Sequence, residues 1–443
     1  MKKLYFVLMA ALMVFVTACS SGDNGNSGGT DGNSGGTGAD TGNADASGTQ
    51  PSGKQVELRY AIWDKNQEPA MQDIIKKFNE TNPNIKVTVE VTPFEQYWTK
   101  LETSAAGKSL PDLFWMNPAN FLKYASNGQL SPISDKIEAD QIDMTNYPQS
   151  LIDLYTFDGN VYSFPKDLDT IGLWYNKVMF DEAGIPYPDD TWDWNKLLEA
   201  AQKLTDPAKG VYGFAAPNDQ QQVMYNFIFQ NEGHVISGDK KSLGYNEPES
   251  LEAMQFLNDL VLKYKVSPTL QQMTDNTTNV LFESGKVAMI TAGSWNQIEF
   301  AQNEYTKDKV DVAPLPKGKK KATVINGLGN VIAANTKHPE EAWLFSKFLG
   351  SKEAADIQAE SGAVIPAFNG TQGPFVSSNP SFNLQVFVDA MEYSVPYPIS
   401  IETRKWQQFE IDYFKRAWAG EISVEEAAKL VTEEGNKVLA EEQ

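Results

Sequence analysis

The chain has 443 residues, with 58 acidic and 37 basic side chains and a formal net charge of −21. This acidic balance argues against a nucleic-acid ligand and against binding of anionic lipid by the folded part, since both call for a basic patch. The two histidines lie far apart in the sequence and no residues have zinc-ligand spacing, so we expect no histidine-rich metal site. We expect no bound metal and no cofactor.

The N-terminus predicts a secretory signal. Two lysines precede the apolar stretch 4–16, which is too short to span a bilayer as a stable helix. The following "VTAC" resembles the lipobox of bacterial lipoproteins, which implies removal of residues 1–18 and attachment of lipid to Cys19. Cys19 is the only cysteine, so an intramolecular disulfide is excluded. The alternative is an ordinary signal peptide followed by an incidental cysteine.

Residues 19–53 predict a tether. After Cys19 the segment is rich in Gly, Ser, Asn and Asp and has no large apolar side chain, so it is expected to stay disordered. No later apolar stretch reaches the length of about 20 residues that a transmembrane helix needs. We therefore expect contact with the membrane through the lipid anchor only, on the extracytoplasmic face and on a Gram-positive surface.

The folded part begins with alternating strand and helix patterns. Residues 56–63 predict a strand, and the next apolar side chains follow the helical spacing i, i+3, i+4, i+7, at Met71, Ile74, Ile75 and Phe78. Residues 85–91 alternate apolar and polar side chains as a strand does, residues 94–101 return to the helical period, and residues 111–116 predict a short buried strand. This order is typical of a parallel sheet and indicates the α/β class.

A second α/β region follows. Residues 211–217 and 287–295 predict strands, and the apolar residues between 254 and 264 predict a helix. Proline and acidic residues from Pro339 onward are typical of the first turn of a helix, and residues 404–419 and 424–440 have the helical period. The chain is long enough for two or three domains.

Two carboxylates, Asp167 and Asp169, adjoin an apolar run that predicts a buried strand. On a strand, residues two apart share a face and lie about 6.6 Å apart. Three readings stay open: solvated acids at a turn, hydrogen-bond acceptors for the hydroxyls of a polyol, and the acid–base pair of a glycosidase.

Three predicted strands are expected to end at a tryptophan, namely Trp63, Trp115 and Trp295. In an open parallel sheet, ligands bind beyond the carboxyl ends of the strands, where an indole can stack on a sugar ring. Core packing is the alternative for each of them. Gly327 and Gly329 lack the third glycine of a dinucleotide-binding fingerprint, so their spacing predicts only a close-packed loop.

Several longer stretches resemble the family 1 extracellular solute-binding proteins, the sugar-binding group that includes the maltose-binding proteins of ABC importers. They include "FNETNPNIKVTVE", "FPKDLDTIGLWYNKVMFDEAGI", "GKVAMITAGSW" and "VINGLGNVIAANTKHPEEAW", and the resemblance covers about residues 56–440. It implies a periplasmic-binding-protein-like fold of type II, in which two discontinuous lobes are joined by a hinge and enclose a ligand cleft.

The resemblance also implies where the lobes divide. The N-terminal lobe is expected at 54–166 with 312–366, and the C-terminal lobe at 167–311 with 367–443. The chain is then expected to cross between lobes near 164–169, 310–314 and 362–375.

Matched residue by residue, the resemblance implies a ligand-binding set. It comprises Trp63, Asp64, Asn117, Asp167, Asp169, Gln221, Trp295, Gly327, Gly329 and Arg404. Asp167 and Asp169 are expected at the floor of the cleft, accepting hydrogen bonds from ligand hydroxyls. The chain has Asn117, Pro118 and Asn120 where maltose-binding relatives carry acidic and basic ligands, which argues against maltose itself.

We therefore expect an extracytoplasmic, monomeric receptor that binds a mono- or oligosaccharide, delivers it to an ABC permease and has no enzymatic activity. Three alternatives stay open. The first is a secreted glycoside hydrolase that uses Asp167 and Asp169, the second a receptor that feeds a surface sensor, and the third a receptor for an amino acid, a polyamine or a metal chelate.

Overall fold

The computed structural model describes residues 55–442 of the chain. The expected signal peptide, the lipidation site Cys19 and the expected tether lie outside these residues. No helix within the described part is both long and apolar enough to cross a membrane.

The first sheet is built mainly from the N-terminal strands. Its order is β11-β3-β1-β2, with β1 (Val56–Ile62), β2 (Ile85–Val91), β3 (Leu113–Met116) and β11 (Gly329–Ile332). The strands β2 and β3 both run parallel to β1, which confirms the predicted parallel arrangement, while β11 joins β3 antiparallel from a distant part of the sequence. The order of the elements in this part was therefore predictable from local periodicity.

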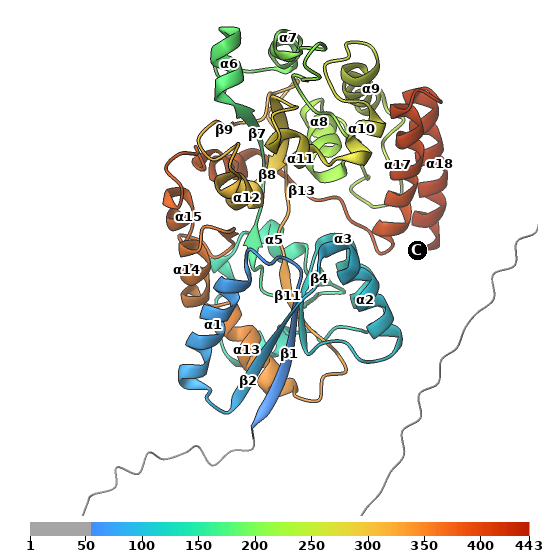
Figure 1. The fold of residues 1–443 in the computed structure, drawn as a ribbon. Helices are drawn as coiled ribbons and strands as arrows, with labels where there is room; N and C mark the ends of the chain where they lie inside the picture. Colours follow the sequence, from blue (N-terminus) through green and yellow to red (C-terminus); the bar gives the residue numbers. More distant parts are fainter. Residues whose placement is uncertain (1–54, 443) are drawn as a thin grey trace, which may run out of the picture. The chain divides into compact units, whose positions relative to one another are not determined.

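Helices cover the faces of this sheet (Figure 1). The helix α1 (Glu68–Thr81) buries the predicted stripe of Met71, Ile74, Ile75 and Phe78, and α2 (Phe94–Ala106) buries Tyr97 and Leu101. The helix α13 (Pro339–Leu349) begins at the predicted proline and packs against β1 and β11. Burial of one apolar face of each helix against the sheet stabilises this half of the molecule.

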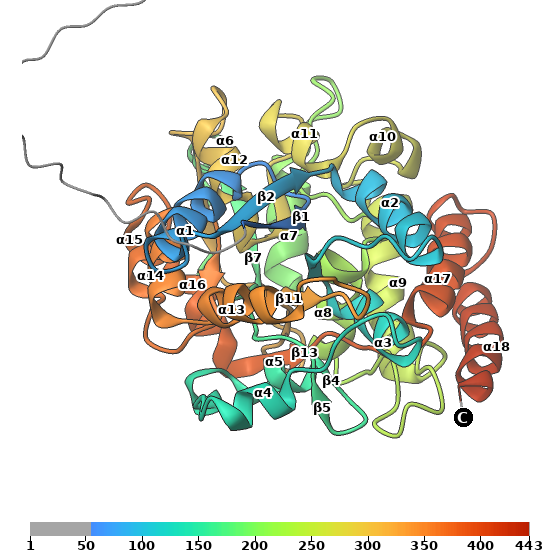
Figure 2. The ribbon, with the colours of Figure 1, turned by 90° about the horizontal axis from the view of Figure 1, so that it is seen from below.

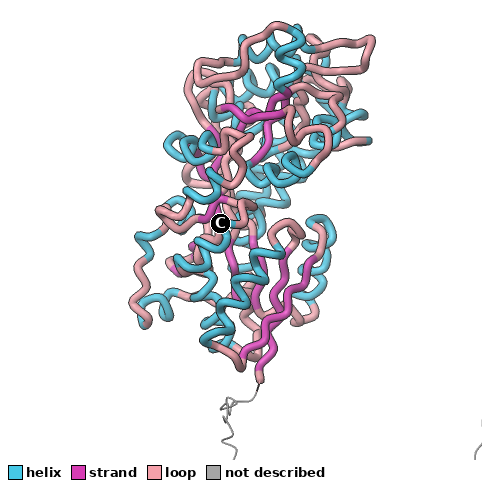
Figure 3. The backbone as a smooth tube through the Cα atoms, turned by 60° about the vertical axis from the view of Figure 1, so that its left-hand side comes forward, coloured by secondary structure: helices cyan, strands magenta, loops and turns pink. Residues whose placement is uncertain are grey.

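The second sheet has three antiparallel strands in the order β8-β7-β9. They are β7 (Ile171–Asn176), β8 (Met289–Gly293) and β9 (Val310–Ala313). The predicted strand 287–295 is confirmed in its central part, because β8 ends at Gly293 and the chain continues into the 3-10 turn η3 (Ser294–Asn296). Figure 3 shows the strands of the two sheets as two separate groups.

The prediction of a strand at 211–217 is wrong. These residues form only isolated bridges, between Asp206 and Val211 and between Tyr212 and Val287. Three successive amides, of Phe214, Ala215 and Ala216, donate instead to acceptors in two different segments: Val266 O and Ser267 Oγ in one, and Met289 O in the other. The segment is apolar because it is a buried loop, and its backbone is satisfied without a ladder.

Helices surround the second sheet. The predicted helices are confirmed as α9 (Pro248–Leu262), α17 (Thr403–Trp418) and α18 (Val424–Glu441), the last two lying side by side (Figures 1 and 2). The remaining helices come from all parts of the described chain. They are α3 (Pro118–Ser126), α4 (Ser134–Ala139), α5 (Gln149–Asp153), α6 (Lys177–Ala183), α7 (Trp194–Leu204), η2 (Gln220–Met224), α8 (Tyr225–Gln230), α10 (Leu270–Asp275), α11 (Thr278–Glu283), α12 (Gln297–Gln302), α14 (Lys352–Glu360), α15 (Gly373–Ser377) and α16 (Gln385–Asp389), with the 3-10 turns η1 (Met144–Asn146) and η4 (Ala390–Tyr393).

Three chain segments meet between the two sheets. The strand β6 (Asp167–Leu168) pairs antiparallel with β12 (Ile365–Pro366). On its other side the same segment bridges the segment before β11, through Pro165–Gly329 and Asp169–Asn326. The amides of Lys166 and Asp169 donate to Leu328 O and Asn326 O at 2.7 and 2.8 Å. These hydrogen bonds hold the three connections together as one narrow link.

One connection differs from the expectation. The strand β9 pairs with β7 of the second sheet, and β10 (Thr323–Ile325) pairs with β13 (Ser394–Pro396), which continues toward α17. The chain leaves these elements only after Ile325 and joins the first sheet at Gly329. Strand pairing thus places the middle connection at residues 326–328 rather than near 310–314, because the apolar residues of β9 fill an edge of the second sheet. The short pair β4 (Thr156–Phe157) and β5 (Asn160–Val161) precedes the first connection.

Candidate ligand-binding site

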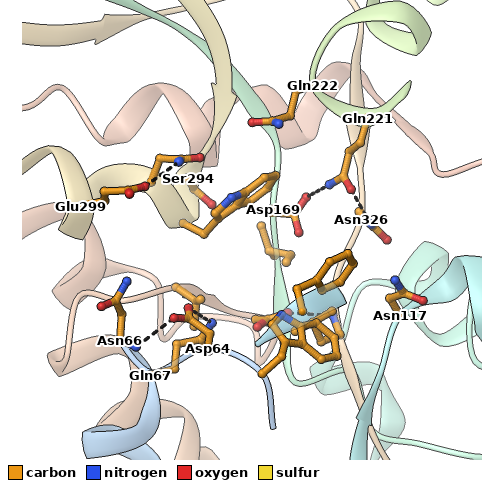
Figure 4. A pocket seen from close by; sticks show the side chains of 18 of the residues that line it. Asp64, Asn66, Gln67, Asn117, Asp169, Gln221, Gln222, Ser294, Glu299 and Asn326 are labelled. Atoms are coloured by element: carbon orange, nitrogen blue, oxygen red, sulfur yellow. Dashed lines mark hydrogen bonds between the residues drawn. The ribbon is translucent and has the colours of Figure 1, made fainter. Parts of the chain in front are cut away.

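A cleft with a volume of about 490 Å³ lies where the link meets both sheets. Figure 4 shows its side chains in two facing rows, with Asp64 and Asn117 in one and Gln222 and Glu299 in the other. The lining residues are Trp63, Asp64, Asn66, Gln67, Phe94, Asn117, Asp167, Leu168, Asp169, Gln221, Gln222, Asn279, Ser294, Trp295, Asn296, Glu299, Asn326, Leu328 and Val364. Most of them come from the loops after β1 and β3, from η2, from the turn after β8 and from the link, while Phe94, Asn279 and Glu299 come from the helices α2, α11 and α12.

Most of the predicted site residues meet in this cleft. Those that line it are Trp63, Asp64, Asn117, Asp167, Asp169, Gln221 and Trp295. Gly327, Gly329 and Arg404 do not line it. Seven of the ten residues implied by the resemblance thus line one cleft, and their contact with a ligand stays a prediction.

The two glycines serve close backbone packing. A Cβ on Gly327 would lie 2.2 Å from Asp167 O, and one on Gly329 would lie 2.6 Å from Ser163 Oγ. Only glycine lets the backbone approach this closely. Their neighbours Asn326 and Leu328 carry the side chains that face the cleft.

Arg404 lies apart from the cleft. It is exposed in the first turn of α17, and its Nη1 donates to Gln407 Oε1 at 3.3 Å. The expectation that it belongs to the ligand set receives no support from this position.

Trp115 is a core residue rather than a stacking platform at a strand end. It lies within β3 and is fully buried, and its Nε1 donates to the Tyr60 hydroxyl at 2.7 Å. The side chain of Lys166 places its Nζ 4.4 Å from the centre of the indole ring. The alternative of core packing is thus the correct one for this tryptophan.

Trp63 forms an aromatic wall of the cleft with Phe94. Its ring meets Phe94 edge-on with ring centres 5.6 Å apart, and it packs in the same manner on Tyr97 and Trp115. The strand β1 ends at Ile62, so Trp63 leaves the sheet and stays half-buried, while Phe94 is 45% exposed. These contacts fix the position of the indole and leave part of it open to the cleft.

Trp295 lies on the opposite side. It follows Gly293 at the end of β8, and a Cβ on this glycine would come within 1.9 Å of the indole. The absence of a side chain at Gly293 lets the ring lie against the backbone, half-buried and facing the cleft. An indole held against a strand end and open to a cleft is suited to stacking on an apolar face of a ligand.

Asp167 already has partners within the protein, and its expected contact with ligand hydroxyls stays a prediction. Lys166 Nζ pairs with its Oδ2 at 2.7 Å, and the Leu328 amide donates to its Oδ1 at 2.7 Å. The same ammonium donates to Gln67 Oε1 at 2.7 Å. Both oxygens of this buried carboxylate thus have partners within the protein, as a buried charge requires. Asp167 shapes the floor of the cleft and fastens the link.

Asp169 has a different environment. Gln221 Nε2 donates to its Oδ1 at 2.7 Å, and Asn326 Nδ2 donates to Gln221 Oε1 at 3.0 Å, so the three side chains form a chain along the cleft (Figure 4). Burial raises the pKa of Asp169 well above its ordinary value, the nearby charge of Asp167 adds to this, and the hydrogen bond from Gln221 opposes it. Donors from a ligand would stabilise the charged form.

A π-helical turn brings two adjacent glutamines to the cleft. The turn η2 follows Asp219, whose Oδ1 accepts from the Gln222 amide at 2.6 Å. Gln221 and Gln222 both line the cleft, although neighbours on a regular helix diverge by about 100°. Wider turns of this kind are frequent at functional sites. No sequence pattern indicates such a turn.

Several buried polar atoms in the cleft lack partners among the described residues. They are Ser294 Oγ, Asn296 Oδ1 and Asn326 Oδ1. Buried polar groups in folded proteins are nearly always hydrogen-bonded, to protein, water or a ligand. Their position in one cleft leaves them available to water or to a polar ligand.

Other lining residues were missed by the sequence analysis. Asn66 and Gln67 follow Asp64 directly, and Ser294 and Asn296 flank Trp295, so proximity to the predicted residues could have found them. Phe94, Asn279 and Glu299 belong to helices whose apolar stripes say nothing about a cleft.

Comparison with known proteins agrees with this geometry. Residues 64–356 match the family model of the bacterial extracellular solute-binding proteins. A curated relative, the arabinooligosaccharide-binding protein of Bacillus subtilis, is 25% identical over 323 residues, covering 70% of this chain and 73% of its own.

Solved structures give the same fold. An ABC substrate-binding protein of Listeria monocytogenes in complex with cycloalternan is 28% identical with a TM-score of 0.82, over 87% of this chain and 100% of that one. An ABC transporter solute-binding protein of Thermotoga lettingae bound with α-D-tagatose is 26% identical with a TM-score of 0.77, over 87% and 100%. The fold is thus α/β and like that of type II periplasmic binding proteins, with two lobes, a hinge and a cleft between them. Since the family match spans more than half of its residues, the chain belongs to the bacterial extracellular solute-binding proteins.

Proposed function

We propose that the protein is an extracytoplasmic receptor that captures an oligosaccharide in the cleft and delivers it unchanged to an ABC importer. The observation that carries this proposal is the composition of the cleft. Two fixed indoles, Trp63 and Trp295, face it from opposite sides, and between them lie Asp169, Gln221, Asn326 and other carboxylate, amide and hydroxyl groups. Flat apolar faces together with many acceptors and donors match the C–H faces and hydroxyls of sugars.

The relatives support a saccharide in particular. One curated relative carries the name of an arabinooligosaccharide-binding protein, and two similar structures hold cycloalternan and tagatose. The cleft volume of about 490 Å³ falls in the range of small-ligand sites. Asn117 caps α3, accepting from the Asn120 amide at 3.2 Å, so its amide nitrogen stays available to a ligand oxygen.

The link supplies the means of signalling. We propose lobes at 55–166 with 327–366 and at 167–326 with 367–442, a division that follows the strand pairing in its middle connection. A ligand that contacts both rows of the cleft favours the closed arrangement of the lobes, and the permease would recognise that arrangement. The partner subunits of such a permease, and a monomeric state of the receptor, belong to this proposal.

Attachment to the membrane also belongs to the proposal. Cys19 would carry the lipid and residues 20–53 would hold the folded part away from the membrane, on the extracytoplasmic face of a Gram-positive cell. A receptor that feeds a surface sensor would use the same cleft. Transport and sensing are distinguished by deleting a permease gene that neighbours the gene for this protein, because loss of sugar uptake would show that the receptor serves transport.

The glycosidase alternative is disfavoured by one observation. An acid–base mechanism needs a carboxyl that exchanges a proton with the substrate, whereas Asp167 is held in a buried ion pair with Lys166 and bonded to the Leu328 amide. Release of shorter products from a bound oligosaccharide, abolished by Asp169→Asn, would overturn the proposed role as a receptor.

Isothermal titration calorimetry with a panel of mono- and oligosaccharides tests the proposal. We expect at least one member to bind with a dissociation constant near 1 μM, about −8 kcal/mol, and to raise the melting temperature as a ligand of the folded state does. Absence of heat and of stabilisation across the panel would overturn it.

A further inference from the structure

The charge of the cleft is unevenly compensated. Four carboxylates line it, at Asp64, Asp167, Asp169 and Glu299, and among the described residues no lysine, arginine or histidine does so. Asp167 is neutralised by Lys166 beneath the floor. Asp64 accepts from the Asn66 amide at 2.8 Å and from the Gln67 side chain at 2.9 Å, so it is occupied by the turn before α1. Glu299 is the acid that is most open.

Glu299 projects from α12 at one end of the cleft (Figure 4). Its side chain is exposed, and its Oε2 accepts from Asn279 Nδ2 at 3.3 Å and from Asn296 Nδ2 at 3.5 Å. Both partners are neutral amides at long distance, so the charge of the carboxylate is left for another group.

A second carboxyl lies near Glu299 at this end. Glu283 closes α11, and its Oε1 is buried with no partner in the described structure. Burial, followed by the charge of Glu299, raises the pKa of Glu283 to about 7. Among the described residues, neither Glu283 nor Glu299 forms an ion pair with a lysine, arginine or histidine.

Unpartnered acceptors lie beside the pair. Asn296 is only 3% exposed and Ser294 only 1%, both line the cleft, and their Oδ1 and Oγ atoms lack hydrogen bonds. Asn296 therefore offers a neutral acceptor next to the Glu299 carboxylate to which its own amide donates. A donor with a positive charge would satisfy both.

We propose that the Glu299 end of the cleft is a subsite for a protonated amino group, so that the receptor prefers a saccharide that bears a free amine. This inference rests on the proposed function and narrows its ligand class. An ammonium group has three donors and no acceptor, which suits Glu299, Asn296 and Ser294 together. A bound metal ion fits less well, because the described residues contain no group of three or more candidate metal ligands.

Matched sugar pairs test the inference. Calorimetry near pH 6 would compare glucosamine with glucose, galactosamine with galactose, and glucosamine oligomers with cello-oligosaccharides and N-acetylglucosamine oligomers of equal length. We expect the free-amine member of at least one pair to bind about fivefold more tightly, the size of one ion pair at a partly exposed site, and this preference should weaken as salt rises.

Two variants locate the effect. Glu299→Gln should remove the preference, measured as the ratio of the two affinities within each pair. Glu199→Gln, which removes the same charge from an exposed position on α7, should preserve it. Equal binding within every pair, or a preference that survives in Glu299→Gln, would overturn the inference alone. If no saccharide of any kind binds, the proposed function falls and the inference falls with it.

Discussion

Gln221 Nε2 donates a 2.7 Å hydrogen bond to Asp169 Oδ1, and this contact joins the π-helical turn η2 to the link between the sheets. Asp169 is also bridged to Asn326 through the backbone, so the three residues join two of the crossing segments to η2. A ligand hydroxyl that donates to Asp169 would therefore bind next to the link about which we propose that the lobes close.

The first prediction concerns Asp169→Asn. The variant keeps the shape of the side chain and removes the charge, so affinity for the cognate saccharide should fall by about 1–3 kcal/mol, as expected for loss of a charge-assisted hydrogen bond. Because burial raises the pKa of Asp169, its charge is costly in the empty protein, and the free energy of unfolding at pH 7 should not decrease. Calorimetry and urea unfolding check the two parts. Asp308→Asn, at an exposed position, is the control, and unchanged affinity in Asp169→Asn would contradict the prediction.

The second prediction concerns Trp295→Ala. Loss of the indole should weaken saccharide binding by about 1–3 kcal/mol, as truncation of aromatic anchors does, with little change in melting temperature because the ring is half-buried. Tyr187→Ala removes an aromatic ring that is 39% exposed and lies outside the cleft, and it should bind normally. Equal affinities of the two variants, measured by calorimetry, would exclude Trp295 from the site.

The third prediction concerns the buried ion pair. Lys166→Met leaves Asp167 buried without its cation and should lower the free energy of unfolding by about 3–5 kcal/mol. Lys136→Met removes a cation from the exposed pair with Glu340 and should cost about 0–1 kcal/mol.

Urea unfolding of both variants gives the comparison. The double variant Lys166→Met with Asp167→Asn should recover part of the loss, because no uncompensated charge remains. A similar small cost at both lysines would show that the pair contributes nothing special.

Local periodicity was sufficient to predict much of the fold. The stripe of α1 and the alternation of β2 arise from contacts between neighbours in the sequence and the sheet, and both elements lie where expected. The segment 211–217 is equally apolar, but its amides donate to two distant segments, around residue 266 and at Met289, which no local pattern records. The middle connection was misplaced for the same reason, since β9 pairs with a strand more than 130 residues earlier.

The candidate site was likewise only partly predictable from the sequence. Trp63 and Trp295 could be predicted because each is a tryptophan beside polar residues at the end of a predicted strand. Both side chains are partly exposed because β1 and β8 end just before them. The partner of Asp167 stands beside it in the sequence, but the Leu328 amide that completes its environment is 161 residues away. Long-range backbone partners decide whether a carboxylate is available to a ligand, and they require the folded structure.

The fourth prediction concerns the close approach within the link. Gly327→Ala would place a Cβ 2.2 Å from Asp167 O, so the backbone must shift, and the free energy of unfolding should fall by about 1–3 kcal/mol. Saccharide affinity should fall as well, because Asn326 and Leu328 move with the backbone. Gly373→Ala is the control, since a Cβ there meets nothing within 4 Å. Equal stabilities of the two variants in urea would contradict the packing argument.

The fifth prediction concerns Glu410, a fully buried carboxyl on α17. It accepts from Tyr225 at 2.9 Å and from the Tyr245 hydroxyl. Burial raises its pKa from 4.5 to about 8, although the two tyrosines oppose the shift. The folded protein therefore holds this proton up to about pH 8, whereas the unfolded chain releases it near pH 4.5.

The contribution of Glu410 to the free energy of unfolding therefore depends on pH. Between these two values the folded state binds more protons, so the contribution of Glu410 to stability is fully present below about pH 4.5 and is lost as the pH rises toward about 8. Glu410→Gln cannot ionise and should show no such loss. The free energy of unfolding of the variant, relative to the parent protein, should thus increase steadily between about pH 5 and pH 8 and then level off. Urea unfolding at several pH values measures this difference, with the exposed Glu433→Gln as a control that runs parallel to the parent. A parallel course for Glu410→Gln would mean that the buried carboxyl titrates at an ordinary pKa.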